Sequence, residues 1–196
     1  MKPPAESLPA EVFEGFYARD PDPWRFATSD YEREKYAATL GALPRARYDS
    51  AFEVGCSIGV LTRQLAPRCG RLLAIDAVEA PLPAARARLE EFPQVEVRRA
   101  RVPEDWPEER FDLILLSEVL YFFNRADLRV VTDRVLGALR PGGDVVLVHW
   151  LPPAEPPFPQ TGDEAVEGFL GFAGAGLRPL LARREAQYRM DVLRRA

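Results

Sequence analysis

The stretch Glu53-Val54-Gly55-Cys56-Ser57-Ile58-Gly59 decides the predicted fold of this chain. It joins a short apolar run, Ser50 to Val54, to a helical pattern that continues through Ala66. Glycines at such a strand-to-helix turn let a ligand approach the backbone closely, and the helix start exposes N–H groups. The turn therefore predicts a ligand site at the end of a strand, although a tight turn that merely needs glycine would have the same spacing.

Strands and helices alternate along the chain after this turn. Four more short apolar runs predict strands: Leu72–Ile75, Val95–Val97, Leu113–Leu116 and Val145–Val148. Helices are expected between them, from about Ala80 to Glu91 and from about Ala126 to Leu139. The runs lack apolar–polar alternation, which is typical of parallel strands covered on both faces. The pattern predicts an α/β fold with right-handed crossovers.

The N-terminal part predicts two helices. Leu8 to Tyr17 has a helical pattern with Ser7 as a candidate cap. Ser29-Asp30 is a stronger start signal for a second helix, which ends near Gly41.

The C-terminal part begins with a proline-rich loop, Leu151 to Pro159, and a helix is expected from about Asp163 to Ala173. Leu177–Arg184 and Ala186–Arg194 then predict two adjacent antiparallel strands at an exposed edge of the sheet.

A length of 196 residues suits one domain. We expect a helical cap (1–47), a βα core (48–150) and a C-terminal part (151–196) within it.

Composition argues against several kinds of site and partner. With one His and two Cys outside any CxxC pair, the chain lacks the ligands of a zinc site, so no metal is expected. The net charge of -4 argues against a nucleic-acid partner. Neither a signal peptide nor a membrane-spanning run is evident, so we expect a cytoplasmic protein without a membrane partner. The oligomeric state is left open, and a monomer is compatible with the sequence.

Asp76 closes the strand that follows the glycine turn. A carboxylate there can accept hydrogen bonds from both ribose hydroxyls of a nucleoside. A dinucleotide site requires G-x-G-x-x-G, but Ser57 stands at the second glycine position and Glu53 would repel a phosphate. Because Glu53 suits the ammonium of an amino acid instead, the combination favours S-adenosylmethionine over NAD.

The chain resembles the class I S-adenosylmethionine-dependent methyltransferases, and specifically the small NodS-like (nodulation protein S) family. The matching segments beyond the turn are Asp22-Pro23-Trp24, Tyr31-Glu32, Lys35-Tyr36, Phe111 to Tyr121, Pro141-Gly142-Gly143 and His149-Trp150. The resemblance implies a three-layer Rossmann-like fold with a mostly parallel seven-stranded sheet whose last strand is antiparallel.

The same resemblance implies a set of cofactor-binding residues. Glu53, Gly55, Cys56 and Gly59 would line the methionine and ribose, Asp76 would bind the ribose hydroxyls, and Ala77 would touch the adenine. Ser117 and Glu118 would lie near the transferred methyl, and Trp24 and Tyr31 would fold over the cofactor. Many relatives carry an acidic residue for the adenine amino group where Val102-Pro103 stands here, so Glu104, Asp105 or a backbone group is left for that role.

The implied activity is methyl transfer to a small-molecule acceptor, with an amine such as an amino sugar of a chitooligosaccharide expected. An amine or hydroxyl acceptor needs a group that takes its proton, and His149 is the first candidate, followed by Glu118 and Tyr121. Alternatively, His149 packs beside Trp150 and bonds to backbone. Phe122 and Phe123 are candidates for pocket wall or core. An O-methyltransferase and a non-catalytic S-adenosylmethionine-binding protein are the competing functions.

Overall fold

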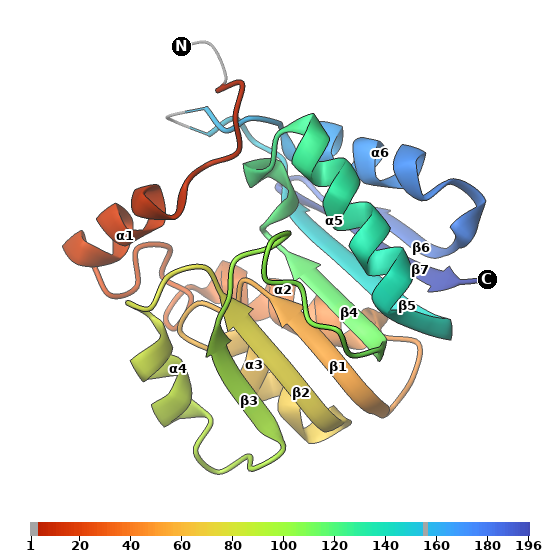
Figure 1. Cartoon of the computed structure of the whole chain (residues 1–196). Helices are drawn as coiled ribbons and strands as arrows, with labels where there is room; N and C mark the ends of the chain where they lie inside the picture. Colours follow the sequence, from red (N-terminus) through yellow and green to blue (C-terminus); the bar gives the residue numbers. More distant parts are fainter. Residues whose placement is uncertain (1–3, 155–156) are drawn as a thin grey trace. The chain divides into compact units, whose positions relative to one another are not determined.

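The structure is a computed structural model that describes residues 4–154 and 157–196 (Figure 1). The chain forms two compact units, which are described one at a time. The first is Pro9–Arg101, and the second combines residues 4–8 with Val102–Ala196.

Three parallel strands make up the sheet of the first unit: β1 (Tyr48–Val54), β2 (Cys69–Asp76) and β3 (Val95–Arg99). β2 pairs with β1 on one side and with β3 on the other. All residues of β1 except Asp49 are buried. This burial on both faces explains why the strand shows no apolar–polar alternation.

The helices of this unit are α1 (Ala10–Arg19), α2 (Asp30–Ala42), α3 (Val60–Leu65), the 3₁₀ turn η1 (Ala66–Arg68) and α4 (Leu82–Arg88). The predicted cap of α2 is confirmed, because the Ser29 side chain accepts a hydrogen bond from the Glu32 N–H. The predicted cap of α1 is wrong. Pro9 precedes that helix, and the Ser7 hydroxyl instead donates to Asp127 and accepts from the Asn124 N–H.

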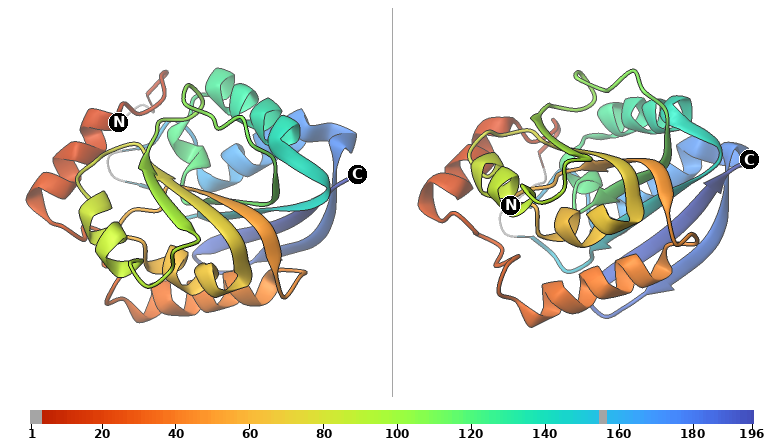
Figure 2. Two further views of the ribbon diagram at one scale, coloured as in Figure 1. Left: turned by 60° about the horizontal axis from the view of Figure 1, so that its bottom comes forward. Right: turned by 90° about the horizontal axis from the view of Figure 1, so that it is seen from below.

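Four strands make up the sheet of the second unit: β4 (Phe111–Ser117), β5 (Leu139–Trp150), β6 (Leu177–Arg184) and β7 (Tyr188–Arg195). β5 is parallel to β4, and β7 is antiparallel to both β5 and β6. The adjacent antiparallel pair of β6 and β7 is confirmed and is visible in both views of Figure 2. Its predicted exposure is wrong for β7, which is mostly buried because it lies between two other strands.

The helices of the second unit are η2 (Leu120–Phe122), α5 (Arg125–Ala138), α6 (Gly162–Ala173) and η3 (Gly174–Gly176). α5 and α6 pack closely at Gly168, where an added Cβ would lie 2.9 Å from Leu128 Cδ2. Among the described residues, no helix is both long and apolar enough to cross a membrane.

The seven strands follow the order β3-β2-β1-β4-β5-β7-β6. The pairs within each unit are parallel except those of β7, the last strand of the chain. The predicted α/β fold with an antiparallel last strand is therefore confirmed.

Candidate functional site

The glycine turn after β1 uses its backbone N–H groups internally. Those of Gly55 and Cys56 both donate to the Ile75 carbonyl, at 2.8 and 2.9 Å, and that of Gly59 donates to Cys56. Gly55 and Gly59 have positive φ angles of 81° and 76°. Since a phosphate-binding loop offers such N–H groups to its ligand, this arrangement does not favour a pyrophosphate site.

Asp76 reaches back from the end of β2 into the same turn. Its Oδ2 accepts from the Ser57 N–H at 2.9 Å, and its Oδ1 accepts from the Val78 N–H at 3.2 Å. Burial raises the pKa of this carboxyl to about 6, although the backbone donors lower it. A carboxylate has about four acceptor positions, so a hydroxyl donor can still be accommodated beside the backbone donors.

Glu53 is the second-last residue of β1, just before the glycine turn, and only 2% of its surface is exposed. Burial raises its pKa to about 7, and the charge of Asp76 raises it further, whereas Thr62 lowers it. Among the described residues, its Oε2 is a buried oxygen without a hydrogen-bond partner. Such an atom is costly unless a donor meets it, and a ligand ammonium group would be a fitting donor.

Tyr17 joins α1 to the turn, and sequence reasoning missed it. Its hydroxyl lies 2.5 Å from the Ser57 hydroxyl. Burial and the nearby Asp76 charge hold the pKa of Tyr17 well above its ordinary value. No periodic signal distinguishes Tyr17 from its neighbour Phe16, because the contact depends on how α1 packs.

Two aromatic residues expected over the cofactor lie in the N-terminal helical part. Trp24 packs edge-on against Phe16 and Tyr17, with ring centroids 5.5 Å apart in both pairs. The Lys35 ammonium lies 5.1 Å from the centroid of the Tyr31 ring. Trp24 is thus part of the aromatic group around Tyr17, and cofactor contacts of Trp24 and Tyr31 stay predictions.

The remaining predicted residues of the first unit have packing or backbone roles in the structure. The Cys56 side chain lies in a small apolar cluster with Ala74 and Leu82, and burial raises the pKa of its thiol. The Ala77 carbonyl accepts a hydrogen bond from Arg99. Their contacts with a cofactor stay predictions.

In the second unit, Glu118 follows the last residue of β4, Ser117, in a left-handed backbone conformation with φ 59°. Its N–H donates to the Val148 carbonyl at 2.8 Å. Its Oε2 accepts from the Tyr121 hydroxyl at 2.7 Å and from the Trp150 N–H at 2.8 Å. The left-handed conformation costs a residue with a side chain about 1–2 kcal/mol of conformational energy, and such strain is concentrated at functional sites.

His149, on β5, is fully buried and packs against Tyr121, the residue that donates to Glu118. Its Nε2 accepts from the Leu120 N–H at 3.1 Å, and its ring meets that of Tyr121 edge-on at 5.5 Å. A neutral ring in this arrangement carries its proton on Nδ1. The structure therefore brings His149, Glu118 and Tyr121 together, and their roles in proton transfer stay predictions.

Val102 and Pro103 are the first two residues of the segment Val102–Ala196 of the second unit. Val102 is buried, and its peptide bond to Pro103 is cis. The group that meets the adenine, whether from these residues or from Glu104 or Asp105, stays a prediction.

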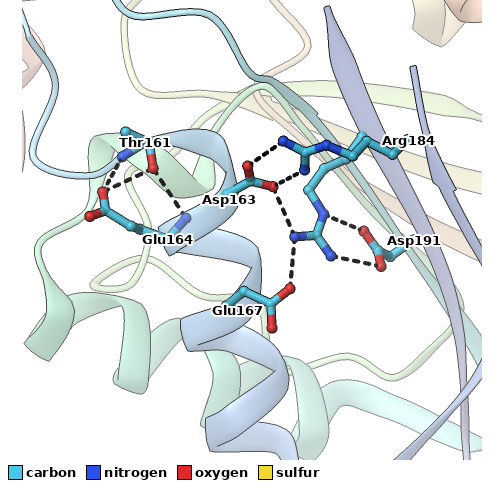
Figure 3. Close-up of polar contacts among 7 residues, drawn as sticks. Thr161, Asp163, Glu164, Glu167, Arg184 and Asp191 are labelled. Carbon is cyan, nitrogen blue, oxygen red and sulfur yellow. Dashed lines mark hydrogen bonds and ion pairs between the residues drawn. The ribbon is translucent and has the colours of Figure 1, made fainter. Parts of the chain in front are cut away.

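An ionic cluster at the C-terminal strands was not predicted (Figure 3). Arg189 of β7 binds Asp191 through two hydrogen bonds of 3.0 and 3.2 Å, and its Nη1 donates to Glu167 at 2.8 Å and to Asp163 at 3.1 Å. Arg184 of β6 also binds Asp163, at 2.5 and 2.7 Å. The cluster therefore connects α6 to the last two strands.

This chain matches the nodulation protein S family model and is similar to curated nodulation S proteins. The family described as Nodulation protein S (NodS) matches residues 16–149. Nodulation protein S of Rhizobium tropici is 36% identical over 127 residues, which cover 64% of this chain and 53% of that protein. Nodulation protein S of Sinorhizobium fredii (strain NBRC 101917 / NGR234) is 34% identical over 127 residues, 64% of this chain and 59% of that protein. The alignments thus span little more than half the length of these relatives.

Two solved structures extend the comparison. A putative methyltransferase from Pseudomonas syringae is 37% identical, with a TM-score of 0.72 over 84% of this chain and 99% of that chain. The N-methyltransferase NodS from Bradyrhizobium japonicum WM9, in complex with S-adenosyl-L-homocysteine, is 24% identical. Its TM-score is 0.82 over 94% of this chain and 97% of that chain, a likeness of fold.

Proposed function

Because this chain belongs to the nodulation protein S family, we propose that it transfers a methyl group from S-adenosylmethionine to an amine of a small-molecule acceptor. The observation that carries the proposal is a pair of carboxylates at one glycine turn, the buried Glu53 and the half-buried Asp76. Glu53 has an oxygen without a hydrogen-bond partner among the described residues, and Asp76 lies at the adjacent strand end. A ligand with both an ammonium group and ribose hydroxyls suits this pair.

The residues of the turn fit the cofactor without a phosphate site. Glu53 would face the ammonium group, and Asp76 would accept from the ribose hydroxyls. When bound, S-adenosylmethionine supplies an electrophilic methyl group on its sulfonium. The task left to the protein is to align the acceptor and exclude water, which is a proximity effect.

An alkylammonium acceptor must lose a proton before it can take up the methyl group. His149, Glu118 and Tyr121 stay the proposed candidates for this step. Glu118 is half-buried, whereas His149 and Tyr121 are buried. The greater exposure of Glu118, together with the two donors that orient its Oε2, supports a direct contact between Glu118 and the acceptor.

The wider proposal concerns partners and location. We propose a small-molecule acceptor and a cytoplasmic location, without nucleic-acid or membrane partners. The N-methyltransferase activity named for the Bradyrhizobium structure supports an amine over a hydroxyl acceptor.

The test combines binding with turnover. S-adenosylhomocysteine binding is measured by calorimetry, and methyl transfer from labelled S-adenosylmethionine is measured on matched panels of amines, amino sugars, alcohols and phenols. We expect micromolar-range binding and labelled N-methyl product. Product on alcohols or phenols alone would indicate an O-methyltransferase, and binding without any turnover would indicate a non-catalytic binding protein. Absence of binding would refute the cofactor itself.

A further inference from the structure

We propose that Phe158, in the proline-rich loop, is a positioning residue that holds Tyr121 and, through it, the Glu118 carboxylate. The inference rests on the proposed function, because it assigns these groups to the acceptor side of a methyltransferase. It adds a residue outside the segments that carry the family resemblance.

The rings of Phe158, Tyr121 and Phe122 form a group in which each ring contacts the other two. The Phe158 ring stacks on the Tyr121 ring with centroids 5.2 Å apart and planes 13° apart. Phe122 meets both rings edge-on, at 4.9 Å from Phe158 and 4.6 Å from Tyr121. Stacked and edge-to-face pairs at such distances are favourable and directional. The orientation of the Tyr121 ring therefore depends on Phe158.

The loop itself is tied to the segment that carries Tyr121. Gln160, two residues after Phe158, donates from Nε2 to the Phe123 carbonyl at 2.7 Å. The Gln160 N–H donates to the Tyr121 carbonyl at 3.3 Å. Pro157 and Pro159 flank Phe158 and restrict the backbone on both sides of it. These contacts make Phe158 a fixed support rather than a free loop side chain.

Tyr121 also contacts the Glu118 carboxylate and His149. The Tyr121 hydroxyl donates to Glu118 Oε2 at 2.7 Å, and His149 packs edge-on against the same ring. Glu118 already has a strained backbone, so its side chain needs contacts that hold it in place. If Phe158 were removed, the Tyr121 ring would gain freedom to tilt, and its hydroxyl would leave the carboxylate.

The test uses Phe158→Ala and a double-mutant cycle with Tyr121→Phe, which keeps the ring but removes the hydroxyl. Phe158→Tyr is the conservative rescue, and Phe158→Leu keeps apolar bulk if the alanine variant folds poorly. The matched control is Phe172→Ala. Phe172 is a half-buried phenylalanine of the same unit that contacts Arg125 and Arg129 rather than this group.

We expect Phe158→Ala to lower kcat by up to about a hundredfold, as small displacements of reacting groups can. The Kd for S-adenosylhomocysteine should change by less than about twofold, since these residues act on the acceptor side in this proposal. Phe158→Tyr should restore kcat. In the Tyr121→Phe background the effect of Phe158→Ala should largely disappear, because coupled residues are not additive. Equal effects of Phe158→Ala in both backgrounds, or no effect beyond that of Phe172→Ala, would overturn the proposal.

A second measurement is independent of turnover. Hydrogen exchange of the amides in residues 120–124 should be faster in Phe158→Ala than in the parent protein or in Phe172→Ala. Unchanged exchange in this segment would also overturn the proposal. A parent protein that lacks methyl transfer on every acceptor would instead refute the proposed function, and the exchange result would still decide whether Phe158 holds the segment.

Discussion

Binding of the cofactor should release a proton from Glu53. The perturbation is Glu53→Gln, which keeps the size of the side chain but cannot ionise. Burial raises the pKa of Glu53 to about 7 in the free protein. At pH 6 such a group is roughly 90% protonated, whereas an ammonium beside it requires the ionised form. Binding that returns the pKa to its ordinary range therefore releases about 0.9 proton from this residue.

The assay is calorimetry of S-adenosylhomocysteine binding at pH 6 in two buffers with different ionisation enthalpies. The affinity of the parent protein should rise with pH up to about 7, and Glu53→Gln should release about 0.9 proton fewer than the parent on binding. Asp76, whose pKa is raised to about 6, leaves a smaller release of roughly half a proton in the variant. Glu96→Gln, on the exposed part of β3, is the control.

The same pKa shift affects the stability of the free protein. Because the folded-state pKa of Glu53 lies above its ordinary value, its contribution is fully present below about pH 4.5 and is lost as pH rises through about 7. Glu53→Gln should therefore raise the free energy of unfolding at pH 8 by up to about 3 kcal/mol. Equal proton release in parent and variant, or a variant that is less stable at pH 8, would refute the reasoning.

Three other changes test the rest of the structure. Asp76→Asn should weaken S-adenosylhomocysteine binding by about ten- to a hundredfold in calorimetry, because hydrogen bonds to a charged group are lost. Arg189→Met should lower the free energy of unfolding in urea by about 3–5 kcal/mol, since it leaves the buried Asp191 without its guanidinium. His149→Ala should lower kcat and leave the Kd for S-adenosylhomocysteine nearly unchanged in steady-state and binding assays.

Each of these has a control or a contradicting result. Asp133→Asn, on an exposed part of α5, should not change cofactor affinity, and an Asp76 variant that binds equally well would contradict the ribose assignment. Arg183→Met, on the exposed strand β6, should change stability by less than about 0.5 kcal/mol. A His149 variant with the parent rate and pH–rate profile would show that His149 only packs.

Much of the fold could be predicted because its signals are local. Short, mostly apolar runs identified the strands of the parallel core, although the run for β3 was weak because Glu96 interrupts it, and Ser29 identified the start of α2. The strand boundaries depend on pairing as well as on local sequence. β5 begins at Leu139, ahead of Pro141, because Leu139 pairs with Phe111 of β4. No local sequence pattern marks this start.

The candidate site was predictable only where a residue follows directly from a strand end. Glu53 and Asp76 were found in this way, and they lie near the ends of β1 and β2. Glu118, which directly follows β4, came from the family resemblance. Tyr17 and Phe158 were not found, because their partners Ser57 and Tyr121 are distant in sequence. A contact of this kind leaves no periodicity.

The sequence by itself determined the glycine turn, the strand–helix alternation and the acidic residues at the strand ends, since these depend on backbone conformation and on burial of nearby residues. Only the tertiary structure decided what surrounds those residues. It buries Glu53 deeply enough to raise its pKa, supports Tyr121 with Phe158, and places β7 between β5 and β6. These features arise from long-range packing, because desolvation and ring contacts depend on which distant segments come together.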